Sequence, residues 1–82
     1  MTDFRSDQLQ VCAFLVASGA ALKSCEQNGR NHCEFLFHDP NGEIEQLAAR
    51  YYKGEPCQAI RFYRALLELK STINRTLYGG GR

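Results

Sequence analysis

The feature that most constrains the fold is an Asn-Gly pair at 28–29 followed by alternating apolar residues. Asn-Gly is a strong signal for a short β-hairpin turn because both residues tolerate a positive φ. After the turn, Cys33, Phe35 and Phe37 alternate with polar residues, which places them on one face of a strand. The segment therefore predicts a β-hairpin with one aromatic face.

The strands of this hairpin are expected over 20–27 and 32–38. In the first strand we expect Leu22 and Ser24 to share the face of the phenylalanines. Two strands alone are only marginally stable in water. Either helices cover the hairpin, or a third strand comes from the 55–58 linker or from a second copy of the chain.

Apolar residues at helical spacing predict helices on both sides of the hairpin. The first is expected over 6–18 and ends at Gly19, where a left-handed residue closes the helix. The second begins after Asp39 or Asn41, either of which can accept hydrogen bonds from its first turn, and it ends at Gly54.

The last helix is expected over 58–78 and carries apolar residues at alternating spacings of three and four. Such a stripe most often packs into a core, and it also resembles a short coiled-coil seam. A shoulder at Ile60, Tyr63 and Leu67 would let one side face the core and the other a partner, for example in a C2 homodimer. The candidate interaction surface comprises Ile60, Tyr63, Leu66, Leu69 and Ile73.

The resulting order is helix, strand, strand, helix, helix, which predicts an α+β domain with helices covering a small antiparallel sheet. A chain of 82 residues holds one domain, expected over 1–78, and the Gly-rich tail at 79–82 is expected to be flexible. No run approaches the ~20 apolar residues of a membrane span, and no signal peptide is recognisable. We therefore expect a cytoplasmic protein that does not enter a membrane.

Charge is unevenly distributed along the chain. Residues 1–43 hold three basic and six acidic side chains, a net charge of −3, whereas residues 44–82 hold seven basic and three acidic side chains, a net charge of +4. Basic residues near aromatic ones can bind nucleic acid. The alternatives are ordinary solvated helix surfaces, or a patch that binds an acidic protein. The candidate nucleic-acid contacts are Arg50, Lys53, Arg61 and Arg64.

The chain offers few groups for metal or catalytic chemistry. Structural zinc sites usually contain two close ligand pairs, and no C-x-x-C occurs here. No motif surrounds a cysteine nucleophile, and Glu43 and Glu45 diverge on a helix whose N-terminus they suit. We expect no catalytic residue, no metal site, no cofactor and four mostly free cysteines. The metal set considered was Cys25, His32, Cys33, His38 and Cys57.

Four stretches of the chain share a pattern: Gly19 after the first helix, Phe-Leu-Phe-His-Asp at 35–39, Gly54 after the second helix, and Leu-Leu-Glu-Leu-Lys at 66–70. This pattern resembles a group of short prokaryotic and phage-borne domains of unknown function. The resemblance implies a bacterial or phage cytosolic setting, and it implies no activity and no site residues. The four cysteines lie outside the pattern, which weakens a redox or metal role.

These observations favour a non-enzymatic binding module. The leading hypothesis is protein–protein association, including self-association through the last helix. The alternative is nucleic-acid binding through the basic C-terminal half.

Overall fold

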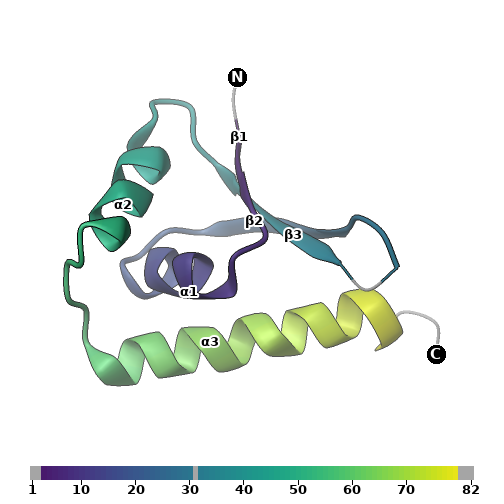
Figure 1. The fold of residues 1–82 in the computed structure, drawn as a ribbon. Coiled ribbons are helices and arrows are strands. Elements are labelled where there is room, and N and C mark those ends of the chain that lie inside the picture. Colours follow the sequence, from purple (N-terminus) through teal and green to yellow (C-terminus); the bar gives the residue numbers. More distant parts are fainter. Residues whose placement is uncertain (1–2, 31, 80–82) are drawn as a thin grey trace.

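The computed structural model describes residues 3–30 and 32–79 and confirms a small α+β domain (Figure 1). The prediction for the tail falls largely outside these residues, because only Gly79 belongs to them. In chain order the elements are β1 (Asp3–Ser6), α1 (Leu9–Ala17), β2 (Leu22–Gln27), β3 (Cys33–His38), α2 (Glu43–Tyr52), α3 (Ala59–Asn74) and a π-helical turn η1 (Arg75–Gly79).

The hairpin strands β2 and β3 belong to a three-stranded antiparallel sheet of order β1-β3-β2. The third strand, β1, comes from the N-terminal residues, so the alternative in which 55–58 or a second copy supplies it is wrong. The other alternative, in which helices cover the hairpin, is confirmed. The predicted element order lacked its first member. Phe4 of β1 pairs with Phe37, and their ring centroids lie 6.4 Å apart. Through this pair the short strand buries an aromatic ring against the core.

A register shift in β2 changes which of its residues face the core. Leu22 pairs with Phe37, but Ser24 pairs with Leu36 and Cys25 with Phe35. Directly paired residues of antiparallel strands share a face, so Cys25, not Ser24, joins Leu22 beside the phenylalanines. The prediction for Ser24 is wrong because the bulge adds one residue to the strand.

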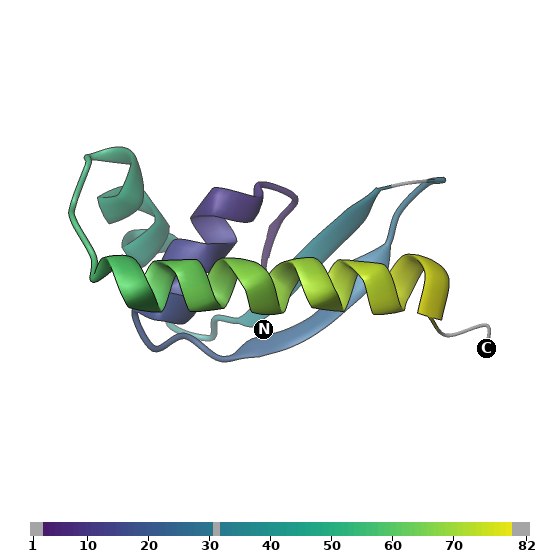
Figure 2. The ribbon, with the colours of Figure 1, turned by 90° about the horizontal axis from the view of Figure 1, so that it is seen from below.

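The helices pack on one face of the sheet, with α1 in the centre (Figure 1). Helix α3 runs beneath α1 and continues along the hairpin, and α2 packs beside α1 (Figures 1 and 2). Among residues 3–30 and 32–79, no helix is both long enough and apolar enough to cross a membrane. The core consists of Val11, Cys12, Ala13, Leu15, Ala17, Phe35, Phe37, Ala48, Ala65 and Leu69.

Helices α1 and α2 each end shortly before a glycine, as predicted. Gly19 has φ 104° and Gly54 has φ 86°, a conformation that side chains with a Cβ rarely adopt. The N–H of Ala20 then donates to the carbonyl of Leu15 at 2.9 Å, a hydrogen bond that closes the end of α1. Helix α1 starts at Leu9, later than predicted, because Ser6 still belongs to β1.

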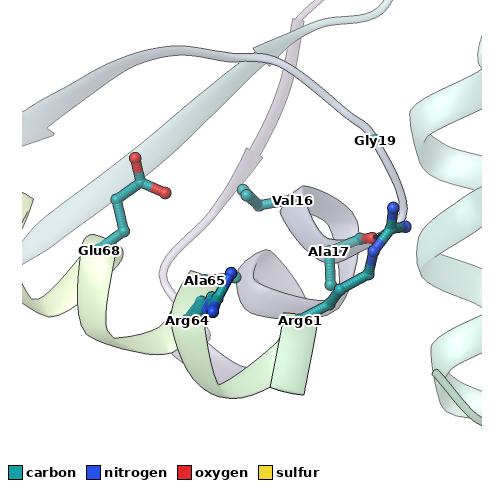
Figure 3. Close-up of a pocket in the computed structure, with 7 residues that line it drawn as sticks. All are labelled: Val16, Ala17, Gly19, Arg61, Arg64, Ala65 and Glu68. Carbon is teal, nitrogen blue, oxygen red and sulfur yellow. Dashed lines mark hydrogen bonds between the residues drawn. The ribbon is translucent and has the colours of Figure 1, made fainter. Parts of the chain in front are cut away.

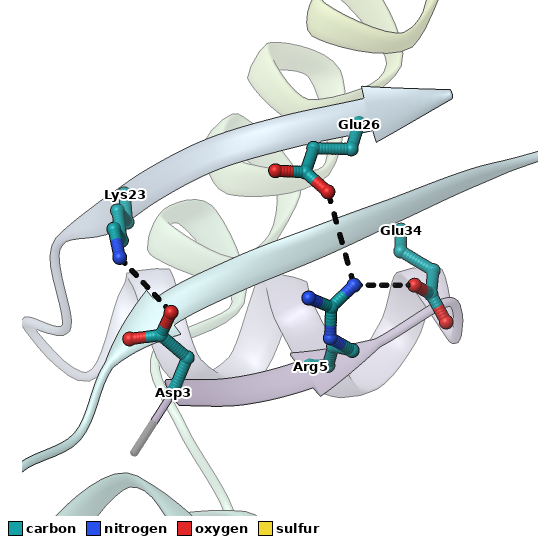
Figure 4. Close-up of polar contacts among 5 residues, drawn as sticks. All are labelled: Asp3, Arg5, Lys23, Glu26 and Glu34. Carbon is teal, nitrogen blue, oxygen red and sulfur yellow. Dashed lines mark hydrogen bonds and ion pairs between the residues drawn. The ribbon is translucent and has the colours of Figure 1, made fainter. Parts of the chain in front are cut away.

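The opposite face of the sheet carries ion pairs that connect its two edge strands across β3 (Figure 4). Lys23 of β2 reaches Asp3 of β1 at 2.9 Å, and Arg5 of β1 lies 2.9 Å from Glu34. Glu26 of β2 lies 3.8 Å from the same Arg5 nitrogen. This face therefore has a layer of paired charges in place of a covering helix.

Candidate binding surface on helix α3

Helix α3 has one apolar side in the core and another in solvent. Leu69 is 1% exposed and Ala65 is also buried. Ile60, Tyr63 and Leu67 are 52%, 55% and 48% exposed. Their spacing of three and four places them on a single side of the helix. We call Ile60, Tyr63 and Leu67 the exposed stripe.

The sequence-based candidate surface divides between these two sides. Ile60 and Tyr63 lie on the exposed stripe. Leu69 is buried, and Leu66 and Ile73 are partly buried against the core. The coiled-coil-like seam of the sequence thus serves mainly to pack α3 onto α1 and the sheet, and the exposed apolar surface comes from its shoulder.

Within the segments that the structure describes, no other element covers the outer side of α3. Figure 2 views the molecule from that side, and α3 lies in front of α1 and the sheet along its whole length. The helix is held from behind by its buried residues, so the exposed stripe is presented on a rigid element. A preformed apolar surface of this kind loses little conformational entropy when a partner binds.

Positive charge surrounds the exposed stripe. Four cationic side chains on α3 and η1 have no carboxylate within 4 Å in the part of the chain that the structure describes: Arg61, Arg64, Lys70 and Arg75. Glu68 is the single acidic residue of α3. This surface therefore carries a net charge of +3, from four cations and one carboxylate.

A shallow groove of about 260 Å³ lies between α3 and the end of α1 (Figure 3). Arg61 reaches from α3 over the end of α1, where its Nη1 donates to the Ala17 carbonyl at 3.4 Å. Arg64 and Glu68 line the same groove. Typical small-molecule sites occupy roughly 300–1,000 Å³, so this groove suits a partner's side chain better than a whole metabolite.

The four candidate nucleic-acid contacts are not equivalent. Arg50 is engaged by Glu55: its Nε donates to Oε1 at 2.7 Å and its Nη2 donates to Oε2. The hydrogen bond from Arg50 lowers the pKa of Glu55, which keeps this carboxylate charged. Lys53, Arg61 and Arg64 have no such neighbour in the described segments.

The residues considered as a metal set do not form one. Within residues 3–30 and 32–79, no group of three or more His, Cys, Asp or Glu side chains is placed to hold a metal ion. His32 lies 3.2 Å from Asp7, and His38 lies 3.7 Å from Asp3. Both histidines thus face carboxylates at the surface and not the thiols.

All four cysteines are free thiols, and Cys12 and Cys33 are buried. Burial raises the pKa of Cys12 to about 11. Burial and the neighbouring Cys25 thiol raise the pKa of Cys33. Because the thiolate is the reactive form, a raised pKa makes these thiols poor nucleophiles. Their positions fit a packing role.

The two carboxylates Glu43 and Glu45 lie in the first turn of α2. Negative charge is favoured there by the helix dipole. The N–H of Glu45 donates to Asp39 at 3.1 Å, so this segment is organised around helix capping.

Comparisons of the chain with protein-family models, with curated proteins and with solved structures find no match.

Sequence reasoning did not single out Lys70 and Arg75 as part of this surface, and it named Leu67 only as a shoulder. The signal was available in the helical periodicity. Lys70 lies three residues and Arg75 eight residues after Leu67, so both lie beside the line of the stripe on the helix.

Proposed function

We propose that this protein is a non-enzymatic binding module that associates with another protein through the exposed stripe on α3. The observation that carries the proposal is the exposure of Ile60, Tyr63 and Leu67 on one side of a helix whose other side is already in the core. Isolated apolar residues on a surface need no explanation, but three at helical spacing form a contiguous patch.

The physical reason is the gain from removing this patch from water. Burying apolar surface is worth roughly 25 cal/mol per Å², so a partner that covers the patch gains affinity without refolding the domain. Tyrosine adds a large, rigid contact area and is common among residues that dominate binding energy. Tyr63 is therefore the expected centre of the interface.

An unbiased peptide selection tests this proposal. A phage library of helical peptides is selected against the immobilised protein, and the affinities of the enriched peptides are measured by fluorescence anisotropy. Tyr63→Ser is compared with Tyr52→Ser, because Tyr52 on α2 is 65% exposed, somewhat more than Tyr63 at 55%. We expect Tyr63→Ser to weaken binding by about 10-fold or more and Tyr52→Ser to leave it unchanged.

Enriched peptides that bind Tyr63→Ser as well as the wild type would contradict the proposal. Self-association is measured on the same samples by size-exclusion chromatography with light scattering. A dimer that dissociates in Ile60→Ser would identify a second copy as the partner.

Nucleic-acid binding is the second candidate function. It is favoured by the cations Lys53, Arg61 and Arg64, which have no carboxylate neighbour in the described part of the chain. It predicts binding to a mixed oligonucleotide pool with an affinity that falls steeply as salt is raised. No binding at low salt would remove this candidate.

A further inference from the structure

The charges around the exposed stripe indicate what kind of partner fits it. Arg64 follows Ile60 by four residues and precedes Leu67 by three, so it lies along the stripe itself. Arg61 lies on the flank toward α1, where it reaches the Ala17 carbonyl. Lys70 lies three residues after Leu67, on the opposite flank. Cations therefore border the apolar patch on both sides.

Among residues 3–30 and 32–79, the cations without a carboxylate partner are concentrated on α3. Elsewhere the cations of the regular elements are matched: Lys23 with Asp3, Arg5 with Glu34, and Arg50 with Glu55. The domain thus neutralises charge within its sheet and along α2, but leaves it open where the apolar patch lies. A partner that covers the patch meets these cations, and carboxylates would satisfy them.

The same charges disfavour a second copy of this chain as the occupant. In an antiparallel pairing that sets Ile60 opposite Leu67 of the second copy, the twofold axis passes between residues 63 and 64. The two copies of Arg64 would then lie next to each other, near the centre of the interface. Like charges placed together in an interface oppose association.

The apolar residues disfavour nucleic acid as the occupant. Ile60 and Leu67 are aliphatic, and they occupy the two ends of the patch. Single-stranded nucleic acid is held by stacking on aromatic side chains, and the stripe offers only Tyr63 for that purpose. Aliphatic residues at helical spacing instead match the side of another helix.

We propose that the partner segment is an acidic amphipathic helix that lies along α3, with apolar residues against Ile60, Tyr63 and Leu67. Its carboxylates then face Arg61, Arg64 and Lys70. This inference rests on the proposed function, because it specifies the chemistry of the partner for the same surface. The groove at the end of α1 is lined by Arg61, Arg64 and Glu68, and one of the partner's acidic side chains would lie beside the two arginines.

Two designed peptides test the inference. Both are 21-residue helices with leucine at the a and d positions, and they carry either glutamate or lysine at the flanking positions. Their affinities for the full chain are measured by fluorescence anisotropy at low and high salt. The glutamate peptide can form three ion pairs with the cations of α3, whereas the lysine peptide places three positive charges against them. We therefore expect the glutamate peptide to bind roughly 10-fold or more tightly, with a smaller preference at high salt.

Matched charge reversals locate the effect. Arg64→Glu is expected to reduce the preference for the glutamate peptide, whereas Lys53→Glu, at an exposed position on the other side of the Gly54 turn, is expected to leave it intact. The double variant Ile60→Ser/Leu67→Ser weakens binding of both peptides. Circular dichroism and thermal unfolding of each variant check that the domain still folds.

The outcomes separate this inference from the proposed function. Equal affinity for both peptides, lost in Ile60→Ser/Leu67→Ser, overturns the acidic partner but leaves the stripe as a docking surface. The acidic partner and the docking surface are both overturned if neither peptide binds at millimolar concentration. They are also overturned if the peptides bind and the double variant does not weaken that binding. Displacement of the glutamate peptide by an equimolar single-stranded oligonucleotide also overturns the inference, in favour of nucleic acid.

Discussion

The carboxylate of Asp39 holds the start of α2 through the backbone of Ile44, whose N–H donates to Oδ1 at 2.9 Å. The second oxygen, Oδ2, accepts from the N–H of Glu45 at 3.1 Å. Asp39 lies outside the helix, directly after β3, and is itself buried. One side chain thus satisfies two open N–H groups and fixes the direction of the chain from the sheet into α2.

This relationship predicts the effect of removing the carboxylate. Asp39→Ala leaves both N–H groups without their acceptor, and we expect it to lower the free energy of unfolding by about 2 kcal/mol. The matched control is Asn41→Ala, because Asn41 is exposed in the same turn and was the alternative cap. Urea unfolding followed by circular dichroism measures both. Equal losses in the two variants would contradict the assignment of the cap to Asp39.

The two sides of α3 predict opposite effects for two neighbouring leucines. Leu69→Ala creates a cavity in the core and is expected to cost about 2–4 kcal/mol of unfolding free energy. Leu67→Ala removes an exposed side chain and is expected to change stability by less than about 0.5 kcal/mol. It is expected to weaken the binding of any ligand to the exposed stripe. Thermal unfolding of the two variants checks this. A large loss of stability in Leu67→Ala would place that residue in the core.

The layer of charges on the open sheet face protects an apolar residue. Leu36 is 3% exposed, and its register partners on that face are Arg5 and Ser24. We infer that the long stem of Arg5 covers Leu36, as the stems of arginines often cover apolar surface.

This inference predicts that packing outweighs charge at Arg5. Arg5→Met keeps a stem of similar length and is expected to change stability by less than about 0.5 kcal/mol, whereas Arg5→Ala uncovers Leu36 and is expected to cost about 1 kcal/mol. Both are measured by urea unfolding at low and high salt. The prediction is contradicted if the two variants lose the same stability and do so only at low salt. In that case Arg5 stabilises the fold mainly through its ion pairs with Glu34 and Glu26.

The pKa of Cys12 predicts how stability depends on alkaline pH. Burial raises this pKa from 9.0 to about 11, so the folded protein keeps the thiol protonated where the unfolded chain ionises it. The stabilisation is fully present below pH 9 and is lost as pH rises from 9 to 11. Linkage gives a loss of about 1–3 kcal/mol over this range.

Cys12→Ser provides the comparison, because a serine hydroxyl does not ionise and can still donate to the Ser6 carbonyl, as the Cys12 thiol does. The variant is expected to lose less stability between pH 9 and pH 11 than the wild type. Cys57→Ser, at a partly exposed site between α2 and α3, serves as the control. Identical pH profiles for wild type and Cys12→Ser would show that this thiol is not the group that titrates.

The elements that could be predicted are those whose signals are local. Gly19 and Gly54 end their helices because a positive φ is a property of the single residue. The hairpin strands follow from the Asn-Gly turn and the alternation around Phe35. Strand β1 could not be predicted in this way, because four residues with one apolar side chain, Phe4, have no periodicity of their own. It is a strand because the free edge of β3 pairs with it.

The face of Ser24 also depended on a partner strand. Alternation assigns faces correctly only while each residue of one strand opposes one residue of the next. The register shift between Leu22 and Ser24 breaks this rule, and nothing in the sequence near Lys23 marks it. The position of a bulge is decided when two strands meet, so it is a property of the pair.

The candidate surface on α3 likewise depends partly on local sequence and partly on tertiary packing. By itself the sequence determined that α3 carries two adjacent apolar stripes, because helical spacing depends only on residue number. Only the tertiary structure decided that Leu69 turns to the core and Ile60 to solvent. The physical reason is that the rotation of α3 about its axis is set by packing against α1 and the sheet, which buries the longer stripe and leaves the shorter one exposed.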